Sequence, residues 1–407
     1  MSLHTPTRRG ILKSLGALGC SAAAWPLTTA VTFAAAPGDA RLVVIVLRGG
    51  MDGLDVLRPV GDPAFAALRP TLATGEALPL GNGFFALHPA LAPLLPLWQA
   101  GELGFAHAVA TPYRDKRSHF DGQDVLEAGT VPGAPGEAFR DGWLNRMIQA
   151  VPGMRGESAY AIGRENMKIL AGAVEVSSWA PEIRFRLTPQ AELLLERLYR
   201  DHPLFMSAQS RAMRLMAELE AEGGFGAPEE EAMEMGGGGR PRPRGDAALA
   251  AFAAGRLNGE ARIAAFSLSG WDTHRNQATA LPGALARLAE VIETLRQGLG
   301  GNWSRTAVLA MTEFGRTVRE NGTRGTDHGT GGLMLMAGGA LRGGQVHGRW
   351  PGLDEASLYD RRDLLPTRDV RAYAAWALRG LFGLERAVLE DDVFPLLDMG
   401  DDPKIVL

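Results

Sequence analysis

Acid–histidine pairs stand in two glycine-flanked segments of this chain. In FSLSGWDTHRNQ, Asp272 lies two residues before His274, and in GTDHGTGG, Asp327 directly precedes His328. Carboxylate and imidazole together are the ligand set expected for zinc, and with more oxygen ligands for manganese or iron. An extended loop would point Asp272 and His274 the same way, because alternate residues share a face. Glycine neighbours permit the turn that Asp327 and His328 would need.

Either pair alone indicates a hydrogen-bonded turn more often than a metal site, so its recurrence after other apolar runs matters. Asp52 follows VVIVL, Ser118 and His119 follow GFAHAVA, Glu313 follows TAVLAM, and His347 follows LMLMAGG. In parallel α/β sheets such positions gather beyond the carboxyl ends of the strands, where ligands bind. We therefore expect a metal site at this edge of the sheet. The candidate ligands are Asp52, Asp272, His274, Glu313, Asp327, His328 and His347.

Short apolar strands and amphipathic helices must position these residues. The strands are expected at 41–47, 103–110, 261–268, 306–314 and 332–339, each as a buried run. Helical patterns cover 88–101, 281–299 and 367–383, and two more fall within 192–222. The alternation predicts an α/β fold, a three-layer α/β/α sandwich with a mainly parallel central sheet.

The segment 223–246 interrupts this pattern with an acidic run, four consecutive glycines and Arg-Pro repeats. Its composition is typical of a surface loop. We interpret it as an insertion in a single domain over 37–407, because candidate site residues fall on both sides of it.

The formal net charge of −4 gives no basic footprint, so nucleic acid is not an expected partner. An anionic substrate would then need cations concentrated at the site. Arg114 and Arg117 are the arginines that we expect to bind it, because guanidinium groups match the geometry of oxyanions.

Residues 1–36 have the anatomy of an export signal: a basic start, a weakly apolar middle and small residues at the end. The motif TRRGILK resembles the twin-arginine pattern, which predicts the twin-arginine export machinery as a partner and a periplasmic or secreted location. Pro26 and the small residues disfavour a membrane anchor, and no later stretch is long and apolar enough to span a membrane. Cys20, the single cysteine, lies in this segment. The rest of the chain therefore has no thiolate zinc site.

Several motifs carry a resemblance to a known family. They are TRRGILK, VLRGGMDGLDVLRP, FFALHPALAPLLPLWQAGEL, RSHFDGQDVLEAG, GWDTHRNQ and TEFGRTVRENGTRGTDHGTGG. These stretches resemble a family of exported bacterial proteins labelled only as a domain of unknown function, over nearly all of 37–407. That family is similar to the alkaline phosphatase and sulfatase superfamily. The resemblance implies an alkaline-phosphatase-like fold and a two-metal hydrolase with a hydroxyl or modified nucleophile.

The resemblance also implies ligand roles. Asp52 matches the superfamily's first metal-ligating aspartate, and Asp327 with His328 matches the pair that completes the same metal position. Asp272 and His274 resemble the pair for the other metal, with a shorter spacing.

Two further residues are possible metal ligands, but their positions agree less well with the superfamily pattern. His347 would be the last histidine ligand. Glu313 occupies the strand-end position and is an alternative ligand, because Asp327 and His328 come later after their strand than the superfamily pattern has them. The implied cofactor is one or two divalent ions, with zinc expected and manganese, iron or calcium as alternatives.

The nucleophile is left open between two interpretations of Ser118. It lies where a helix should begin, a place that favours a developing anion and an activated hydroxyl. It is equally a typical helix cap that accepts a backbone N–H. His119 is a ligand, a proton donor or a structural histidine. The RSHFD sequence lacks the C/S-x-P-x-R pattern of sulfatases, and the chain has no GxSxG elbow of serine esterases.

Taken together, the sequence predicts an exported metal-dependent hydrolase of phosphate esters, or of related sulfate or phosphonate esters, that acts on a small anionic molecule. The alternative is a non-catalytic exported binding or assembly protein on the same fold, with a degenerate or structural metal site.

Overall fold

The computed structural model describes residues 38–407 except 115, 133–139, 164–166 and 180–244. The expected signal segment 1–36, the helical patterns within 192–222 and nearly all of the expected insertion at 223–246 lie outside the described residues. In the described part of the chain, no helix has the length and apolar character needed to cross a bilayer.

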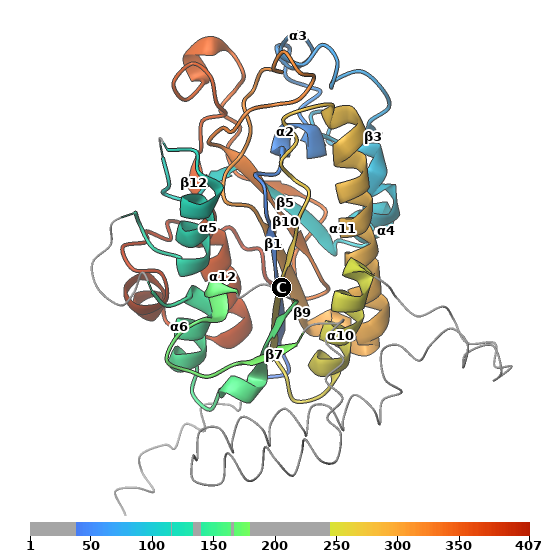
Figure 1. Ribbon diagram of the computed structural model, residues 1–407. Helices are drawn as coiled ribbons and strands as arrows, with labels where there is room; N and C mark the ends of the chain where they lie inside the picture. The colour runs from blue at the N-terminus through green and yellow to red at the C-terminus, as the bar shows by residue number, and fades with distance from the viewer. Residues whose placement is uncertain (1–37, 115, 133–139, 164–166, 180–244) are drawn as a thin grey trace, which may run out of the picture.

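A nine-stranded sheet runs through the middle of the described structure (Figure 1). Its order is β11-β5-β10-β9-β1-β8-β6-β7, with β12 also paired to β5. Neighbouring strands are parallel except around β10, which is antiparallel to both β5 and β9. The strands are β1 Arg41–Leu47, β5 Leu103–Ala110, β6 Ala159–Ile162, β7 Ser177–Trp179, β8 Ile263–Leu268, β9 Thr306–Met311, β10 Gly332–Ala337, β11 Val346–His347 and β12 Arg368–Asp369.

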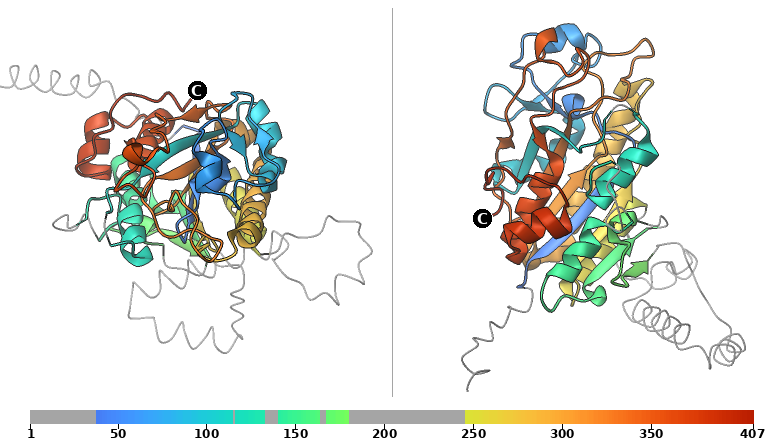
Figure 2. Two further views of the ribbon diagram at one scale, coloured as in Figure 1. Left: turned by 90° about the horizontal axis from the view of Figure 1, so that it is seen from above. Right: turned by 90° about the vertical axis from the view of Figure 1, so that its left-hand side faces the viewer.

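Helices cover both faces of this sheet and give three layers, as expected from the sequence (Figures 1 and 2). One face carries α5 His119–Ala128, α6 Trp143–Ala150 and α12 Val370–Phe382. The other carries α4 Leu95–Gln99, α10 Asp246–Asn258 and α11 Gln277–Leu299. A small antiparallel sheet of β2 Leu57–Arg58, β4 Ala86–Leu87 and β3 Leu78–Pro79 lies apart from the main one. The short helices α2 Gly53–Val56 and α3 Phe65–Leu68 follow β1.

Within the described residues the expected strands and helices are present, most of them with shifted ends. The strands expected at 41–47 and 103–110 match β1 and β5, and those expected at 261–268, 306–314 and 332–339 are shorter. The expected helix 88–101 is a 3-10 helix over Pro89–Leu94 continued by α4, with Pro93 inside the 3-10 turn. Asp369 caps α12 by accepting from the Arg371 N–H, and Gly383 ends it at a φ of 69°.

The direction of β10 differs from the expectation of a buried parallel strand. The segment 312–331 between β9 and β10 contains no helix. A parallel return would need a crossover, usually a helix, so the chain comes back beside β9 in the opposite direction. The burial was expected correctly, since all six residues of β10 are buried.

A buried ion pair lies at the carboxyl end of β1. Asp52 caps α2 by accepting from the Leu54 N–H at 3.1 Å, and its other oxygen accepts from Arg69 Nη1 at 2.6 Å. Both side chains are 1 % exposed. Arg69 also donates to the backbone carbonyls of Thr317 and Val318. Burial by itself would raise the pKa of Asp52, but the Arg69 guanidinium and the Gln277 amide outweigh it and hold the pKa below its usual value.

We predict that Arg69→Met lowers the free energy of unfolding by about 3–5 kcal/mol, because it leaves the Asp52 carboxylate buried without its cation. The double variant Asp52→Asn, Arg69→Met should recover part of this loss, since it removes the uncompensated charge. Urea unfolding of both variants measures the difference. A double variant that is as unstable as the single one would contradict this account of the pair.

Candidate metal centre

Arg316 joins the loops that follow the carboxyl ends of three strands. Its side chain is fully buried, and its Nη2 donates to Asp272 Oδ1 at 2.5 Å. The same guanidinium also donates to backbone carbonyls of Gly49 and Gly50 after β1, Trp271 after β8 and Thr326 after β9. An arginine can contact several loops at once because its guanidinium carries five N–H donors in a rigid planar arrangement. Segments more than two hundred residues apart are thereby held at one edge of the sheet.

Three imidazoles converge on one oxygen of Asp272. The Nε2 atoms of His274, His328 and His119 lie 3.1, 3.3 and 3.5 Å from Asp272 Oδ1. His274 Nε2 and His328 Nε2 are 2.9 Å apart. Ligand-type atoms of His119, Asp272 and His328 all lie within 4.8 Å of one another. The acid–histidine pairs expected from the sequence therefore do meet, and His119 joins them.

The opposite nitrogen of each ring faces an acceptor oxygen. These acceptors are Glu313 Oε1 for His119 Nδ1 at 2.7 Å, Asp327 Oδ1 for His274 Nδ1 at 3.2 Å and the Arg117 carbonyl for His328 Nδ1 at 2.8 Å. An ionised carboxylate or a carbonyl only accepts, so each neutral ring carries its hydrogen on Nδ1. That leaves a lone pair on every Nε2, and all three lone pairs face the Asp272 carboxylate.

Lone pairs that face a carboxylate repel it unless positive charge lies among them. His119 Nε2 is buried and has no hydrogen-bond partner, which marks it as an atom that a cation would satisfy. A tetrahedral zinc ion with bonds of about 2.0–2.1 Å places its ligand atoms roughly 3.3–3.4 Å apart. Four of the six separations among these ligand atoms run from 2.9 to 3.5 Å, close to that value. The residues therefore fit a divalent ion.

The electrostatics keep Asp272 ionised. Burial would raise its pKa, but the Arg316 hydrogen bond and charge, with His274 and His119 nearby, lower the pKa to about 2. The Glu313 hydrogen bond raises the pKa of His119 against the effect of burial. Burial lowers the pKa of His328 and so favours its neutral form.

Glu313 contacts the candidate ligand His119 and lies outside the group of converging ligand-type atoms. It is fully buried, and its carboxylate accepts from the Gly49 N–H at 2.9 Å, Gln123 Nε2 at 3.2 Å and the Thr312 hydroxyl at 2.9 Å, besides His119. Glu313, expected as an alternative ligand, thus contacts His119 Nδ1 and not the Nε2 atoms that converge on Asp272. Asp327, also an expected ligand, accepts from Asn321 Nδ2 at 3.0 Å and holds His274 in place.

Two other expected ligands are not in the group of ligand atoms in the described structure. Asp52 is neutralised by Arg69, as described above. His347 lies in β11 opposite Ala106, partway along β5, where it is buried beside Tyr373 with a ring separation of 6.3 Å. The sequence spacing could not predict that Asp52 and His347 lie outside the group, because each position depends on a residue that is distant in sequence.

Ser118 caps α5, one of the two interpretations left open by the sequence. Its hydroxyl accepts from the Asp121 N–H at 3.4 Å, and its own N–H donates to the Tyr113 hydroxyl at 2.8 Å. The cap places Ser118 immediately before His119, whose ring is in the centre. The capping contact does not decide whether the hydroxyl also reacts.

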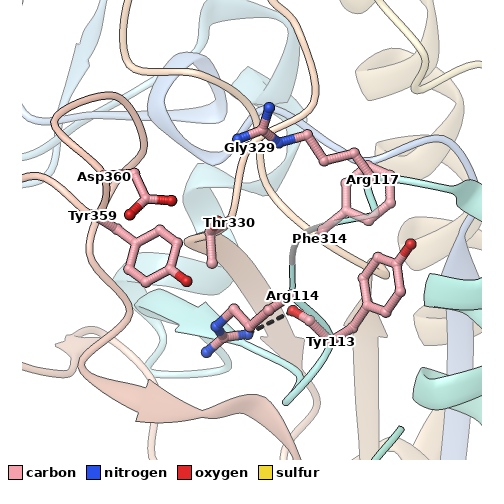
Figure 3. A pocket seen from close by; sticks show the side chains of 8 residues that line it. All are labelled: Tyr113, Arg114, Arg117, Phe314, Gly329, Thr330, Tyr359 and Asp360. Atoms are coloured by element: carbon pink, nitrogen blue, oxygen red, sulfur yellow. Dashed lines mark hydrogen bonds between the residues drawn. The ribbon is translucent and has the colours of Figure 1, made fainter.

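Arg114 and Arg117 line a small cavity beside the centre (Figure 3). Phe314, another lining residue, connects the two places: its ring centroid is 5.1 Å from that of His119 and 4.9 Å from that of His328. Phe314 and Arg316 were not predicted from the sequence. Both belong to TEFGRTVREN, a stretch that resembles the family but offers no charge pattern that marks either residue.

A family model described as "Protein of unknown function (DUF1501)" matches residues 105–374. No curated protein matches the chain. The lipoteichoic acid synthase LtaP from Listeria monocytogenes matches in structure at 9 % identity and a TM-score of 0.34, over 69 % of this chain and 57 % of that one. The chain thus spans little more than half the length of that relative.

Two further solved structures match at similar levels. The C-terminal periplasmic domain of EcEptC from Escherichia coli has 8 % identity and a TM-score of 0.34, over 75 % of this chain and 74 % of that one. A protein in the alkaline phosphatase superfamily from Vibrio parahaemolyticus has 12 % identity and a TM-score of 0.31, over 74 % and 61 %. Such low identities and TM-scores carry no inference about activity.

We predict that Glu313→Gln weakens metal affinity by about 10–100-fold, because the amide no longer fixes the tautomer and orientation of His119. Competition with a coloured chelator measures the affinity. The matched control is Glu127→Gln, which changes another buried glutamate, one paired with Arg48 at 2.8 Å. Equal affinities in the two variants would show that Glu313 does not support the centre.

Proposed function

We propose that this chain, which belongs to the DUF1501 family of proteins of unknown function, is an exported metal-dependent hydrolase of phosphate esters or of related sulfate or phosphonate esters. One observation carries the proposal: three imidazoles, each with an acceptor oxygen at Nδ1, place their Nε2 atoms within 3.5 Å of one carboxylate oxygen. Arrangements of this kind support metal catalysis when a position stays open to substrate. The solvent exposure of Asp272 and His274, 48 % and 38 % of their side chains, is consistent with such access.

The proposed ion is held by His119, His274, His328 and Asp272, with zinc expected and manganese, iron or calcium as alternatives. When bound, it supplies Lewis acidity toward an ester oxygen or a nearby hydroxyl. Glu313 and Asp327 keep two of the imidazoles in place. Arg316 keeps Asp272 charged and fixed. Arg114 and Arg117 bind an anionic group of the substrate.

Ser118 is the proposed nucleophile, since its hydroxyl lies next in sequence to a candidate ligand and at the start of the ten-residue helix α5. Helix N-termini favour developing negative charge. His119, the other residue expected to take part in catalysis, is assigned here to hold the ion. In this step the Ser118 oxygen forms a bond to the central atom of the ester as the ester alcohol leaves, and the hydroxyl proton goes to that leaving oxygen or to water.

A second candidate function is a non-catalytic exported binding or assembly protein with a structural metal site. Two observations favour it. The centre offers four ligand side chains, which is the number that closes a structural zinc site. In addition, Asp52 is satisfied by Arg69 and Gln277, so the described structure leaves it no unmet need for a second ion.

Two substitutions of Ser118 separate these functions. Ser118→Ala removes both hydroxyl and cap, and should cost about 0.5–2 kcal/mol of stability; Ser118→Asn keeps a capping oxygen without a hydroxyl. If Ser118 is the nucleophile, both variants lose hydrolysis by at least roughly a thousandfold, in keeping with the loss of other catalytic nucleophiles. The measurement is a screen against phosphate mono- and diesters and sulfate esters with metal-loaded protein. Full activity in Ser118→Asn would reduce Ser118 to a helix cap.

Export is proposed through the twin-arginine machinery to the periplasm or the outside of the cell. Replacing Arg8 and Arg9 together by lysine should keep the precursor in the cytoplasm, because the paired arginines are the recognition signal. Immunoblots of cell fractions report the location. Unchanged export of the Lys-Lys variant would argue for another route.

A further inference from the structure

The cavity beside the metal centre is small and charged (Figure 3). Its volume is about 20 Å³, which is more than the roughly 10–15 Å³ that a single water needs. The cavity therefore has room for one small chemical group but not for a whole ring or sugar. Figure 3 shows the guanidinium groups of Arg114 and Arg117 on opposite sides of Thr330, with Tyr359 and Asp360 on a neighbouring loop.

The contacts of the two arginines leave positive charge in the cavity. Arg114 donates to the carbonyl of Tyr113 at 2.7 Å and lies over the Tyr359 ring at 5.9 Å, and neither partner is an anion. Arg117 Nη2 is 3.8 Å from Asp363 Oδ2, beyond hydrogen-bond length. Asp363 is meanwhile paired with Arg362 at 2.8 Å. The charged residues of the lining are two arginines and Asp360, a net charge of +1.

The cavity meets His328 on its Nδ1 side, where Arg117 is a lining residue. His328 presents Nε2 to Asp272 and Nδ1 to the Arg117 carbonyl, and the outward directions of these two nitrogens diverge widely. Gly329, the next residue, is in the cavity wall. An anion between the arginines would thus be separated from the ion by an imidazole. It would not be the group at which the ester is cleaved.

From this placement we infer that the cavity is a second anion subsite, which binds an oxyanionic substituent of the substrate apart from the scissile group. The inference rests on the proposed function and narrows it: the substrate is an ester that carries a further carboxylate, phosphate or sulfate. Arginine forks supply paired N–H donors to such groups. The rings of Tyr113, Phe314 and Tyr359 line the same space and limit the room for water.

A pair of non-hydrolysable ligands tests the subsite on the metal-loaded protein. Propylphosphonate and 3-phosphonopropionate differ by one terminal carboxylate, and calorimetry gives both affinities. We expect the second ligand to bind at least about tenfold more tightly, as a charge-assisted contact would provide. In the double variant Arg114→Met, Arg117→Met the ratio of the two affinities should fall to about one, because the cations that favour the carboxylate are removed. The control Arg296→Met, on α11 and 45 % exposed, should keep the gain.

Equal affinities for the two ligands in the unaltered protein would overturn the inference, as would a gain that persists in the double variant. Inorganic phosphate binding to chelator-treated protein separates this failure from failure of the proposed function. Phosphate binding that the double variant loses supports the subsite even if no metal is found. Phosphate binding that is unaffected by the double variant contradicts it, whatever the outcome for the metal.

Discussion

The candidate centre depends on one buried guanidinium. Arg316 gathers carbonyls from the loops after β1, β8 and β9 and holds the Asp272 carboxylate at 2.5 Å. Without that cation, the loops would present several unsatisfied carbonyls and a carboxylate to one another, which is costly in a buried place. Asp272 in turn is the point on which three imidazoles converge. Arg316 therefore fixes the carboxylate around which the other candidate ligands lie.

The two aspartates that pair with buried arginines differ in how much of their side chain stays exposed. Asp52 and Arg69 form a closed, fully buried pair, whereas Asp272 keeps almost half of its side chain exposed although it meets Arg316. Asp52 has its cation and two further donors, whereas three imidazole nitrogens approach the Asp272 oxygen that Arg316 holds. These contacts favour a single cation site beside Asp272 and do not support a two-ion centre that includes Asp52.

Much of the frame could be predicted from sequence because burial leaves a strong pattern. β1 is buried along its whole length and is apolar after Arg41, and β5 is likewise buried and apolar except for His107. Strand direction leaves no such pattern, and the antiparallel β10 could not be foreseen. The residue types of the site were also visible, since histidine is rare and aspartate recurs beside it.

The sequence did not indicate which acid contacts which histidine in the site. The sequence suggests that Asp327 works with its neighbour His328, but Asp327 holds His274 and His328 points to Asp272. Likewise Glu313 orients His119 from 194 positions away. Such contacts depend on which loops the fold brings together, and local spacing carries no information on them.

The most direct test is the position of an ion in crystals of the purified protein, located by anomalous diffraction at the absorption edge of the metal found in it. The account predicts one ion bonded to Nε2 of His119, His274 and His328, at about 2.0–2.1 Å if the metal is zinc. A protein that binds no ion there, with hydrogens on those nitrogens instead, would contradict it.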